Sequence, residues 1–179
     1  MPVSEELDLS WVTPQLAVGG SFPMERAADL LHDLGIARVV DVRRECCDDE
    51  AVLREHGLVL LSLPTEDRCA ISQPMLDDGV LWVRDQLRAG HRVLIHCEYG
   101  IGRSALLALC VLADSGLGAI PALSALKEAR WKVAPSPEQL EGFRTWLSRR
   151  GLHAPPLEAF FEIAYAHLRR GETGTGTVD

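Results

Sequence analysis

One short stretch of the sequence combines a cysteine, two glycines and an arginine at a spacing that could bind phosphate. Directly after an apolar segment the chain reads His96-Cys97-Glu98-Tyr99-Gly100-Ile101-Gly102-Arg103-Ser104. A loop with glycines can turn successive backbone N–H groups inward to form a nest for an anion. A helix that starts just after the loop adds the positive end of its dipole. The backbone from 98 to 102, together with Arg103, is therefore predicted to bind a phosphate group.

Cys97 and Arg103 are the side chains of this loop that could carry phosphoryl chemistry. Helix N-termini and cationic neighbours favour the ionised form of a cysteine, so Cys97 is expected to be a thiolate nucleophile at neutral pH. The planar guanidinium of Arg103 can bind two phosphate oxygens and stabilise the charge of a phosphoryl group in transfer. An isolated cysteine would be interpreted as a core residue, but the glycines and the arginine around Cys97 favour a catalytic role.

The residues at the two ends of the loop each have a functional and a structural interpretation. His96 is expected either to hold the loop and tune the thiolate by hydrogen bonds, or to be a buried imidazole with satisfied hydrogen bonds. The hydroxyl of Ser104 could bond to the cysteine sulfur and help it leave in a second step, or it could cap the following helix. The position of Ser104 directly after Arg103 favours the catalytic interpretation.

Cleavage of a phosphate ester also requires a group that gives a proton to the leaving oxygen. Two carboxylates, Glu66 and Asp67, follow a strand-like segment at 58–63. This segment should run parallel to the strand at 92–95, because a helix at 73–89 joins them, and parallel strands end at the same sheet edge. Both carboxylates are thus candidates for the proton donor, and their position in the chain does not distinguish between them.

Alternating strand-like and helix-like segments must position these groups. Apolar, β-branched runs predict buried strands at 36–42, 58–63 and 92–95, after an early strand or hairpin at 11–18. Periodic apolar stretches bounded by glycine or proline predict helices at 23–34, 48–56, 73–89, 103–114, 117–129, 136–147 and 157–168. This order predicts an α/β fold of three layers, in which a mostly parallel twisted sheet has helices on both faces. Ligands of such sheets bind beyond the carboxyl ends of the strands, where the Cys97 loop begins.

The composition fits one globular domain and disfavours several classes of function. Of the 179 residues 47% are hydrophobic, and 18 basic against 26 acidic side chains give a net charge of −8, which argues against nucleic-acid binding. The apolar run at 105–113 is too short to span a membrane, and no cysteine–histidine spacing fits a metal site. With no apolar signal core at the N-terminus, we expect a cytoplasmic protein. The expected organisation is one domain at 1–170, with an accessory helix at 157–168 and a flexible tail at 171–179.

The residues at 96–104 resemble the signature of the protein tyrosine phosphatase superfamily, in its small (atypical) dual-specificity branch. The pattern His-Cys, five residues and Arg-Ser/Thr matches throughout, and a weaker similarity extends over 11–146. The resemblance implies the cysteine-phosphatase fold, with about five strands, and selects Asp67 over Glu66 as the general acid. It also implies a two-step reaction through a phosphocysteine, with neither metal nor cofactor. A segment similar to 135–139 holds a water-supporting glutamine in some relatives, so Gln139 is a candidate for this role, and an exposed helical glutamine is the alternative.

The resemblance further implies a phosphorylated protein or peptide as substrate. The sequence does not determine the oligomeric state, and a monomer is taken as the default. Glu98 and Tyr99 occupy positions where relatives that act on phosphoinositides are often more basic, which disfavours an inositol lipid. The alternatives are a phosphatase of small-molecule or phosphoinositide substrates, a rhodanese-like sulfurtransferase and, less favoured, an inactive phosphopeptide-binding module. The last requires the loss of a catalytic residue, whereas Cys97, Arg103 and a candidate acid are all present.

Overall fold

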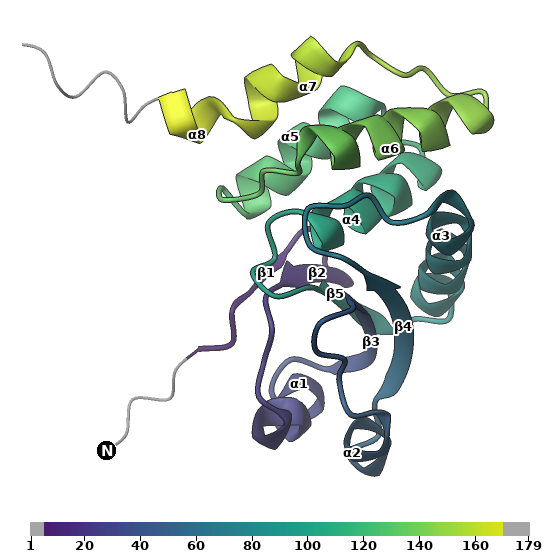
Figure 1. Ribbon diagram of the computed structural model, residues 1–179. Helices are drawn as coiled ribbons and strands as arrows, with labels where there is room; N and C mark the ends of the chain where they lie inside the picture. The colour runs from purple at the N-terminus through teal and green to yellow at the C-terminus, as the bar shows by residue number, and fades with distance from the viewer. Residues whose placement is uncertain (1–5, 170–179) are drawn as a thin grey trace, which may run out of the picture.

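The computed structural model describes residues 6–169, which fold into a five-stranded sheet between layers of helices (Figure 1). The strands are β1 (Leu9–Trp11), β2 (Leu16–Gly19), β3 (Ile36–Arg43), β4 (Val59–Thr65) and β5 (Arg92–His96). Their order across the sheet is β1-β2-β5-β3-β4, with β1 antiparallel to β2 and all other neighbours parallel. The predicted α/β fold with a mostly parallel sheet is confirmed.

Strand β5 lies at the centre of the sheet and ends directly before Cys97. Val93 and Ile95 contribute to the core on one face, and Leu94 contributes to the core on the other, which is the alternation of a strand covered on both sides. Its parallel neighbours β2 and β3 both pair with it as far as His96. The Cys97 loop therefore begins at the carboxyl edge, in the middle of the sheet.

Strand β4 differs from the buried strand that its sequence predicts. It is the edge strand beside β3, and Leu63 and Thr65 are its buried residues. The strand continues through Pro64, which an edge tolerates because the missing N–H is not needed by an outer neighbour. The register between β3 and β4 shifts here, where Arg43 pairs with Thr65. The loop with Glu66 and Asp67 follows, at the same edge of the sheet as Cys97.

Two short helices cover one face of the sheet (Figure 1). They are α1 (Ala27–His32) and α2 (Glu50–Glu55). The predicted helix at 23–34 is shorter than expected, because a 3-10 turn at Met24–Arg26 comes before α1. Leu30 and Leu53, buried on these helices, pack in one cluster with residues of β3 and β5. This layer gives the sheet its second covered face, which the predicted parallel topology requires.

The other face carries the larger core. It is covered by α3 (Gln73–Arg88) and α4 (Arg103–Asp114), and α5 (Ala119–Ala129) and α6 (Pro137–Arg149) pack against α4 from outside. Every α4 residue from 103 to 113 is buried, so α4 is a central core helix, as its apolar sequence predicts. None of the helices among residues 6–169 is long and apolar enough to cross a membrane.

The predicted helix at 157–168 is two helices that break at Tyr165, and they add an outer layer to the predicted three (Figure 1). These are α7 (Leu157–Ala164) and α8 (Ala166–Arg169). Phe160 of α7 packs against Phe143 of α6, with ring centroids 5.7 Å apart. Lys127 Nζ of α5 donates to the carbonyl of Ala164 at 2.7 Å, and burial lowers the pKa of Lys127 to about 8. The apolar side of α7 thus covers the protein's own helices. The tail predicted at 171–179 lies outside the described residues.

Candidate active site

The Cys97 loop joins β5 to α4 and places a buried sulfur beside a hydroxyl. Cys97 is 3% exposed and Ser104 is fully buried. Ser104 Oγ lies 3.2 Å from Cys97 Sγ, within hydrogen-bond distance. The N-cap of α4 is Gly102, and no side chain caps it. Of the two interpretations of Ser104, the structure therefore favours contact with the sulfur over helix capping.

Arg103 is held firmly beside the loop. Its Nη1 and Nη2 donate to the two carboxylate oxygens of Glu45 at 2.7 and 2.6 Å, and Nη1 also donates to the carbonyl of Thr65 at 2.8 Å. These hydrogen bonds from Arg103 lower the pKa of Glu45 to about 2. Arg103 Nε is buried and has no hydrogen-bond partner among the described residues. Unpaired buried donors are rare in folded proteins, which suggests that Nε has a partner when a ligand is bound. A bound anion could accept a hydrogen bond from Nε while Arg103 keeps its pair with Glu45.

Behind the nucleophile, both ring nitrogens of the buried His96 face oxygen atoms. Nε2 lies 2.6 Å from Oδ2 of Asp48, and Nδ1 lies 3.3 Å from the carbonyl oxygen of Cys97. Arg43 donates to the other oxygen of Asp48 at 2.9 Å. Asp48 and the Cys97 carbonyl therefore hold the His96 ring from both nitrogens and fix its orientation next to Cys97.

Arg43 also connects the buried pair of His96 and Asp48 to the Cys97 loop. Its guanidinium donates to Asp41 at 3.1 Å and to Glu98 at 2.9 Å, and Glu98 also accepts from Ser21 Oγ at 3.2 Å. Burial opposes the charge of Arg43, but its hydrogen bonds with Asp41 and Glu98 outweigh burial and raise its pKa. The Glu98 side chain thus pairs with Arg43, and only its backbone N–H is available to an anion in the loop.

The other side of the loop is held by Arg130 and by the close approach of Gly100 to β2. Arg130 Nε donates to the carbonyl of Gly100 at 2.8 Å, and Nη2 donates to the carbonyl of Tyr99 at 2.9 Å. Gly100 has a φ of 64°, and a Cβ on it would lie 2.5 Å from the carbonyl carbon of Gly19. Both the backbone conformation and the space therefore require glycine at this position.

We expect Gly100→Ala to destabilise the protein more than the control Gly90→Ala, and to reduce turnover. Both glycines have a positive φ, 64° and 87°, so each variant loses roughly 1–2 kcal/mol from the left-handed conformation. A Cβ at position 90 would have nothing within 4 Å, so the control isolates the clash with Gly19 and Arg130, which should cost a further ~1–3 kcal/mol. Chemical denaturation measures both losses, and equal losses would show that the loop does not depend on this approach.

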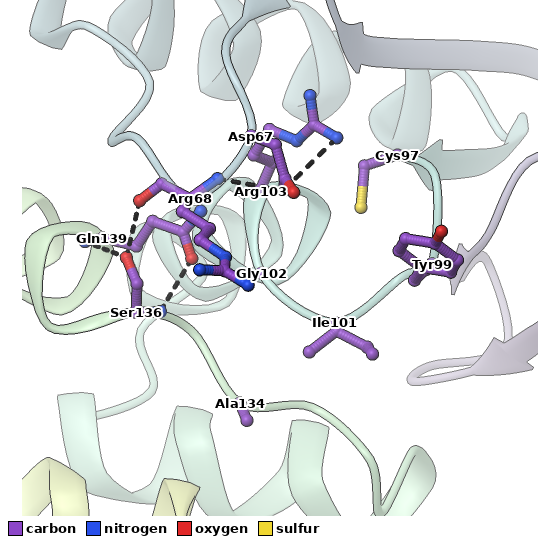
Figure 2. Close-up of a pocket in the computed structure, with 10 residues that line it drawn as sticks. All are labelled: Asp67, Arg68, Cys97, Tyr99, Ile101, Gly102, Arg103, Ala134, Ser136 and Gln139. Carbon is purple, nitrogen blue, oxygen red and sulfur yellow. Dashed lines mark hydrogen bonds and ion pairs between the residues drawn. The ribbon is translucent and has the colours of Figure 1, made fainter.

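Asp67 and Glu66 differ in what their side chains contact. Asp67 is 64% exposed, lies 3.6 Å from Arg103 Nη2 and lines the same pocket as Cys97 (Figure 2). Glu66 pairs instead with Arg44, at 2.8 Å, and does not line that pocket. The geometry therefore favours Asp67 over Glu66 as the proton donor, the same choice that the family resemblance implies.

Gln139 is buried, so the alternative of an exposed helical glutamine is wrong. Its Oε1 accepts from the backbone N–H of Ser136 at 2.8 Å, which completes the cap of α6, and its Nε2 donates to the carbonyl of Cys69 at 3.2 Å. A Cβ on Gly102 would lie 2.6 Å from Gln139 Oε1, so the amide sits against the loop. A role in positioning water stays a prediction, because the amide is already engaged in binding the loop after Asp67.

The site is a pocket of about 310 Å³. Figure 2 shows its lining residues, which are Asp67, Arg68, Cys97, Tyr99, Ile101, Gly102, Arg103, Ala134, Ser136 and Gln139. The predicted nucleophile Cys97, the predicted acid Asp67 and Arg103 therefore line one pocket, and the predicted Gln139 lines it as well. The buried His96 and Ser104 are in contact with Cys97 and do not line the pocket.

Sequence reasoning missed four charged residues that hold the loop, namely Arg43, Glu45, Asp48 and Arg130. The first three follow or end β3, whose carboxyl end lies beside that of β5. A charged residue at the end of an otherwise buried strand, on the edge of the sheet that carries the site, can indicate a role in the site. Arg43 is such a residue. Arg130 carries no comparable signal, since a basic residue at a helix end is ordinary.

Solved structures with the same arrangement of strands and helices identify the class of fold. Tk-PTP in its active form superposes with a TM-score of 0.74 at 24% identity, over 79% of this chain and 97% of that chain. PTPMT1 in complex with PI(5)P gives 0.73 at 19% identity, over 80% and 98%, and human DUSP28 gives 0.69 at 24% identity, over 82% and 97%. The fold is that of the α/β cysteine phosphatases. No match is found among the curated proteins.

Family membership follows from a match over most of the chain. Residues 7–148 match the family described as Swiss Army Knife protein, DSP-PTPase phosphatase domain. The chain belongs to this family, in the atypical dual-specificity branch of the protein tyrosine phosphatase superfamily. It carries a cysteine-based phosphatase domain, and its reaction class is the hydrolysis of phosphoric monoesters.

Proposed function

We propose that the protein is a tyrosine or dual-specificity protein phosphatase that acts through a phosphocysteine at Cys97. In the first step the thiolate attacks phosphorus, a P–S bond forms, and Asp67 gives its proton to the oxygen that leaves as the P–O bond breaks. In the second step water attacks phosphorus and transfers a proton to Asp67. The P–S bond then breaks, and the hydrogen bond from Ser104 stabilises the departing thiolate. The products are an alcohol or phenol and inorganic phosphate.

The observation that carries this proposal is the convergence of three groups on one pocket. Cys97 Sγ and the Arg103 guanidinium come from the loop after β5 and the first turn of α4, the Asp67 carboxylate comes from the loop after β4, and all three line the same cavity (Figure 2). Cys97 is fixed by its burial beside Ser104, whereas Asp67 is 64% exposed and can meet a leaving group that enters from solvent. The N-terminus of α4 directs the positive end of its dipole toward the loop that carries the sulfur.

A protein substrate is favoured by the charge of the surface next to the pocket. An adjoining groove shares Asp67 and Tyr99 with the pocket, and its other lining residues are Arg44, Glu45, Glu66 and Glu98. The four carboxylates of the groove are in ion pairs, and its one lining guanidinium, Arg44, is paired with Glu66, so the described residues of the groove offer no unpaired cation to the several phosphates of an inositol headgroup. The alternative of a phosphoinositide substrate stands on a similar fold, since PTPMT1 has been crystallised with PI(5)P.

The experiment that tests the proposal compares turnover on four kinds of substrate. Purified protein is assayed with an aryl phosphate, with phosphotyrosine and phosphothreonine peptides, with a soluble phosphoinositide, and with thiosulfate and cyanide for sulfur transfer. We expect hydrolysis of the aryl phosphate and of the peptides, with the peptides preferred over the phosphoinositide. Sulfur transfer without phosphate release would reject the phosphatase mechanism. Release of phosphate from the phosphoinositide alone would reject the protein substrate.

Removal of the charge behind His96 should slow the reaction although Asp48 touches no substrate. In Asp48→Asn, His96 Nε2 loses the carboxylate partner that lies 2.6 Å away, so the position of His96 next to the nucleophile changes. We expect kcat to fall about tenfold to a hundredfold, the usual cost of a small displacement of reacting groups. Alkylation of Cys97 by iodoacetamide at fixed pH should slow in parallel. The exposed control Asp78→Asn should change neither rate, and an unchanged alkylation rate in Asp48→Asn would contradict the link through His96.

A further inference from the structure

We propose that Arg68 selects substrates that carry a second anionic group beside the phosphate, and that this group is an acidic side chain of a phosphopeptide. This inference deepens the function proposed above and rests on it. Arg68 directly follows the general acid and lines the pocket together with Cys97 and Arg103. In Figure 2 its side chain lies between Asp67 and Ser136, with the guanidinium toward the interior of the pocket.

The Arg68 guanidinium is available for a ligand. Within residues 6–169 its side chain has neither a hydrogen-bond partner nor an ion-pair partner, although the neighbouring Asp67 and Arg103 form an ion pair. The other cation of the pocket, Arg103, is engaged by Glu45 and keeps only Nε unpaired. A substrate with one phosphate would use that donor and the loop backbone, and the Arg68 charge would remain without a partner. A second anion completes the pairing.

The backbone at Arg68 is held in a conformation that few side chains adopt. Its φ is 63°, the only positive value at a non-glycine residue in the described part of the chain. Two hydrogen bonds fix it, because Arg68 N–H donates to Asp67 Oδ1 at 2.9 Å and Ser136 Oγ donates to the Arg68 carbonyl at 2.7 Å. Such local strain persists where the surrounding structure enforces it, and it is concentrated at functional sites. Here the left-handed turn directs a cationic side chain into the pocket.

The two sides of the pocket differ in what they offer to a second anion, and this distinguishes its possible sources. Arg68 offers a cation on one side. The adjoining groove carries Glu45, Glu66 and Glu98, each already paired with an arginine, and its own lining arginine, Arg44, is paired with Glu66. A headgroup with several phosphates would therefore find no unpaired cation among the described residues of the groove. A phosphopeptide can instead present one acidic residue to Arg68 and neutral or basic residues to the groove. The charge distribution therefore favours an acidic phosphopeptide.

The test compares phosphotyrosine peptides that differ at one position next to the phosphotyrosine, before it or after it, where they carry Glu, Gln or Lys. At low ionic strength we expect kcat/KM for Glu over Gln to be about two- to fivefold at one of the two positions, as for an accessible ion pair. Arg68→Lys should keep this ratio, Arg68→Gln should bring it to about one, and Arg68→Glu should shift the preference to Lys. Arg88→Gln, at an exposed arginine at the end of α3, should keep the wild-type ratio.

Three outcomes would overturn the proposal. The first is a wild-type ratio of one at both positions, and the second is a ratio that Arg68→Gln leaves unchanged. The third is an Arg68-dependent preference for a soluble inositol bisphosphate over every peptide, which would reject the peptide as the source of the anion. Failure of the proposed function gives a different result, because the wild-type protein would then release no phosphate from any peptide.

Discussion

Cys97→Ser is expected to abolish turnover and to retain substrate binding. The hydroxyl of serine is a far weaker nucleophile than a thiolate at neutral pH, and removal of a nucleophile lowers kcat by about 10⁴-fold or more. The loop backbone and the Arg103–Glu45 pair do not involve the sulfur. A phosphopeptide should therefore still bind, and the variant should retain it on a column or raise its fluorescence anisotropy.

The matched control for this variant is Cys46→Ser, at an exposed free cysteine outside the pocket. It should keep wild-type kcat, since it makes the same chemical change at a distance from the reacting phosphorus. Mass spectrometry under acid quench should detect a phosphorylated peptide that contains Cys97 in the wild-type protein and none in Cys97→Ser. If Cys97→Ser hydrolysed an aryl phosphate at the wild-type rate, the assignment of the nucleophile would be wrong.

The second large effect is expected for Asp67→Asn, and its size should depend on the leaving group. Asparagine has the shape of aspartic acid but cannot protonate the departing oxygen, and general acids contribute about 10²–10⁴-fold. An alkyl phosphate such as a phosphoserine peptide needs that proton most, whereas a nitrophenolate leaves readily without it. We therefore expect a loss of about 10²-fold or more on the peptide and a clearly smaller loss on the nitrophenyl ester.

Glu66→Gln serves as the matched control, because it removes a carboxylate from the neighbouring position. Its partner Arg44 is exposed, and the pair lies outside the Cys97 pocket, so both substrates should be hydrolysed at nearly wild-type rates. Equal slowing of the two substrates in Asp67→Asn would contradict its role as acid. A large loss confined to Glu66→Gln would transfer the role to Glu66.

The parts of the fold that depend on local pattern could be predicted from the sequence. Helix α4 occupies residues 103–114, as its sequence predicts, because its apolar run starts at the loop and ends in a polar Asp-Ser-Gly segment. The order of the strands could not be predicted in this way. β4 has the apolar composition of a buried strand, but its place at the edge is set by which strands pair. The break at Tyr165 between α7 and α8 likewise could not be predicted, because no glycine or proline marks it in the sequence.

The residues of the candidate site likewise fall into those that the local sequence predicts and those that it does not. The nine-residue motif carries its own spacing, so the loop, its cysteine and its arginine could be predicted. The residues that hold the motif act through burial and through ion pairs across the sheet. Both depend on the tertiary structure and cannot be predicted from the local sequence. In the sequence, Asp48 and Glu45 do not differ from other acidic residues of loops. Only the fold places Asp48 against His96 and Glu45 against Arg103. The choice of Asp67 over Glu66 likewise needs the direction of each side chain.

The contacts that α6 makes with the acid loop have a consequence for how often the site opens. Ser136 and Gln139 bond to the carbonyls of Arg68 and Cys69 and also form the cap of α6. The loop that carries Asp67 therefore cannot swing outward without loss of bonds at a helix terminus about 70 residues away in the chain, each worth ~1 kcal/mol. The population of the open loop is thereby linked to the fraying of that helix. Loss of its cap should therefore weaken the hold on the loop that carries Asp67.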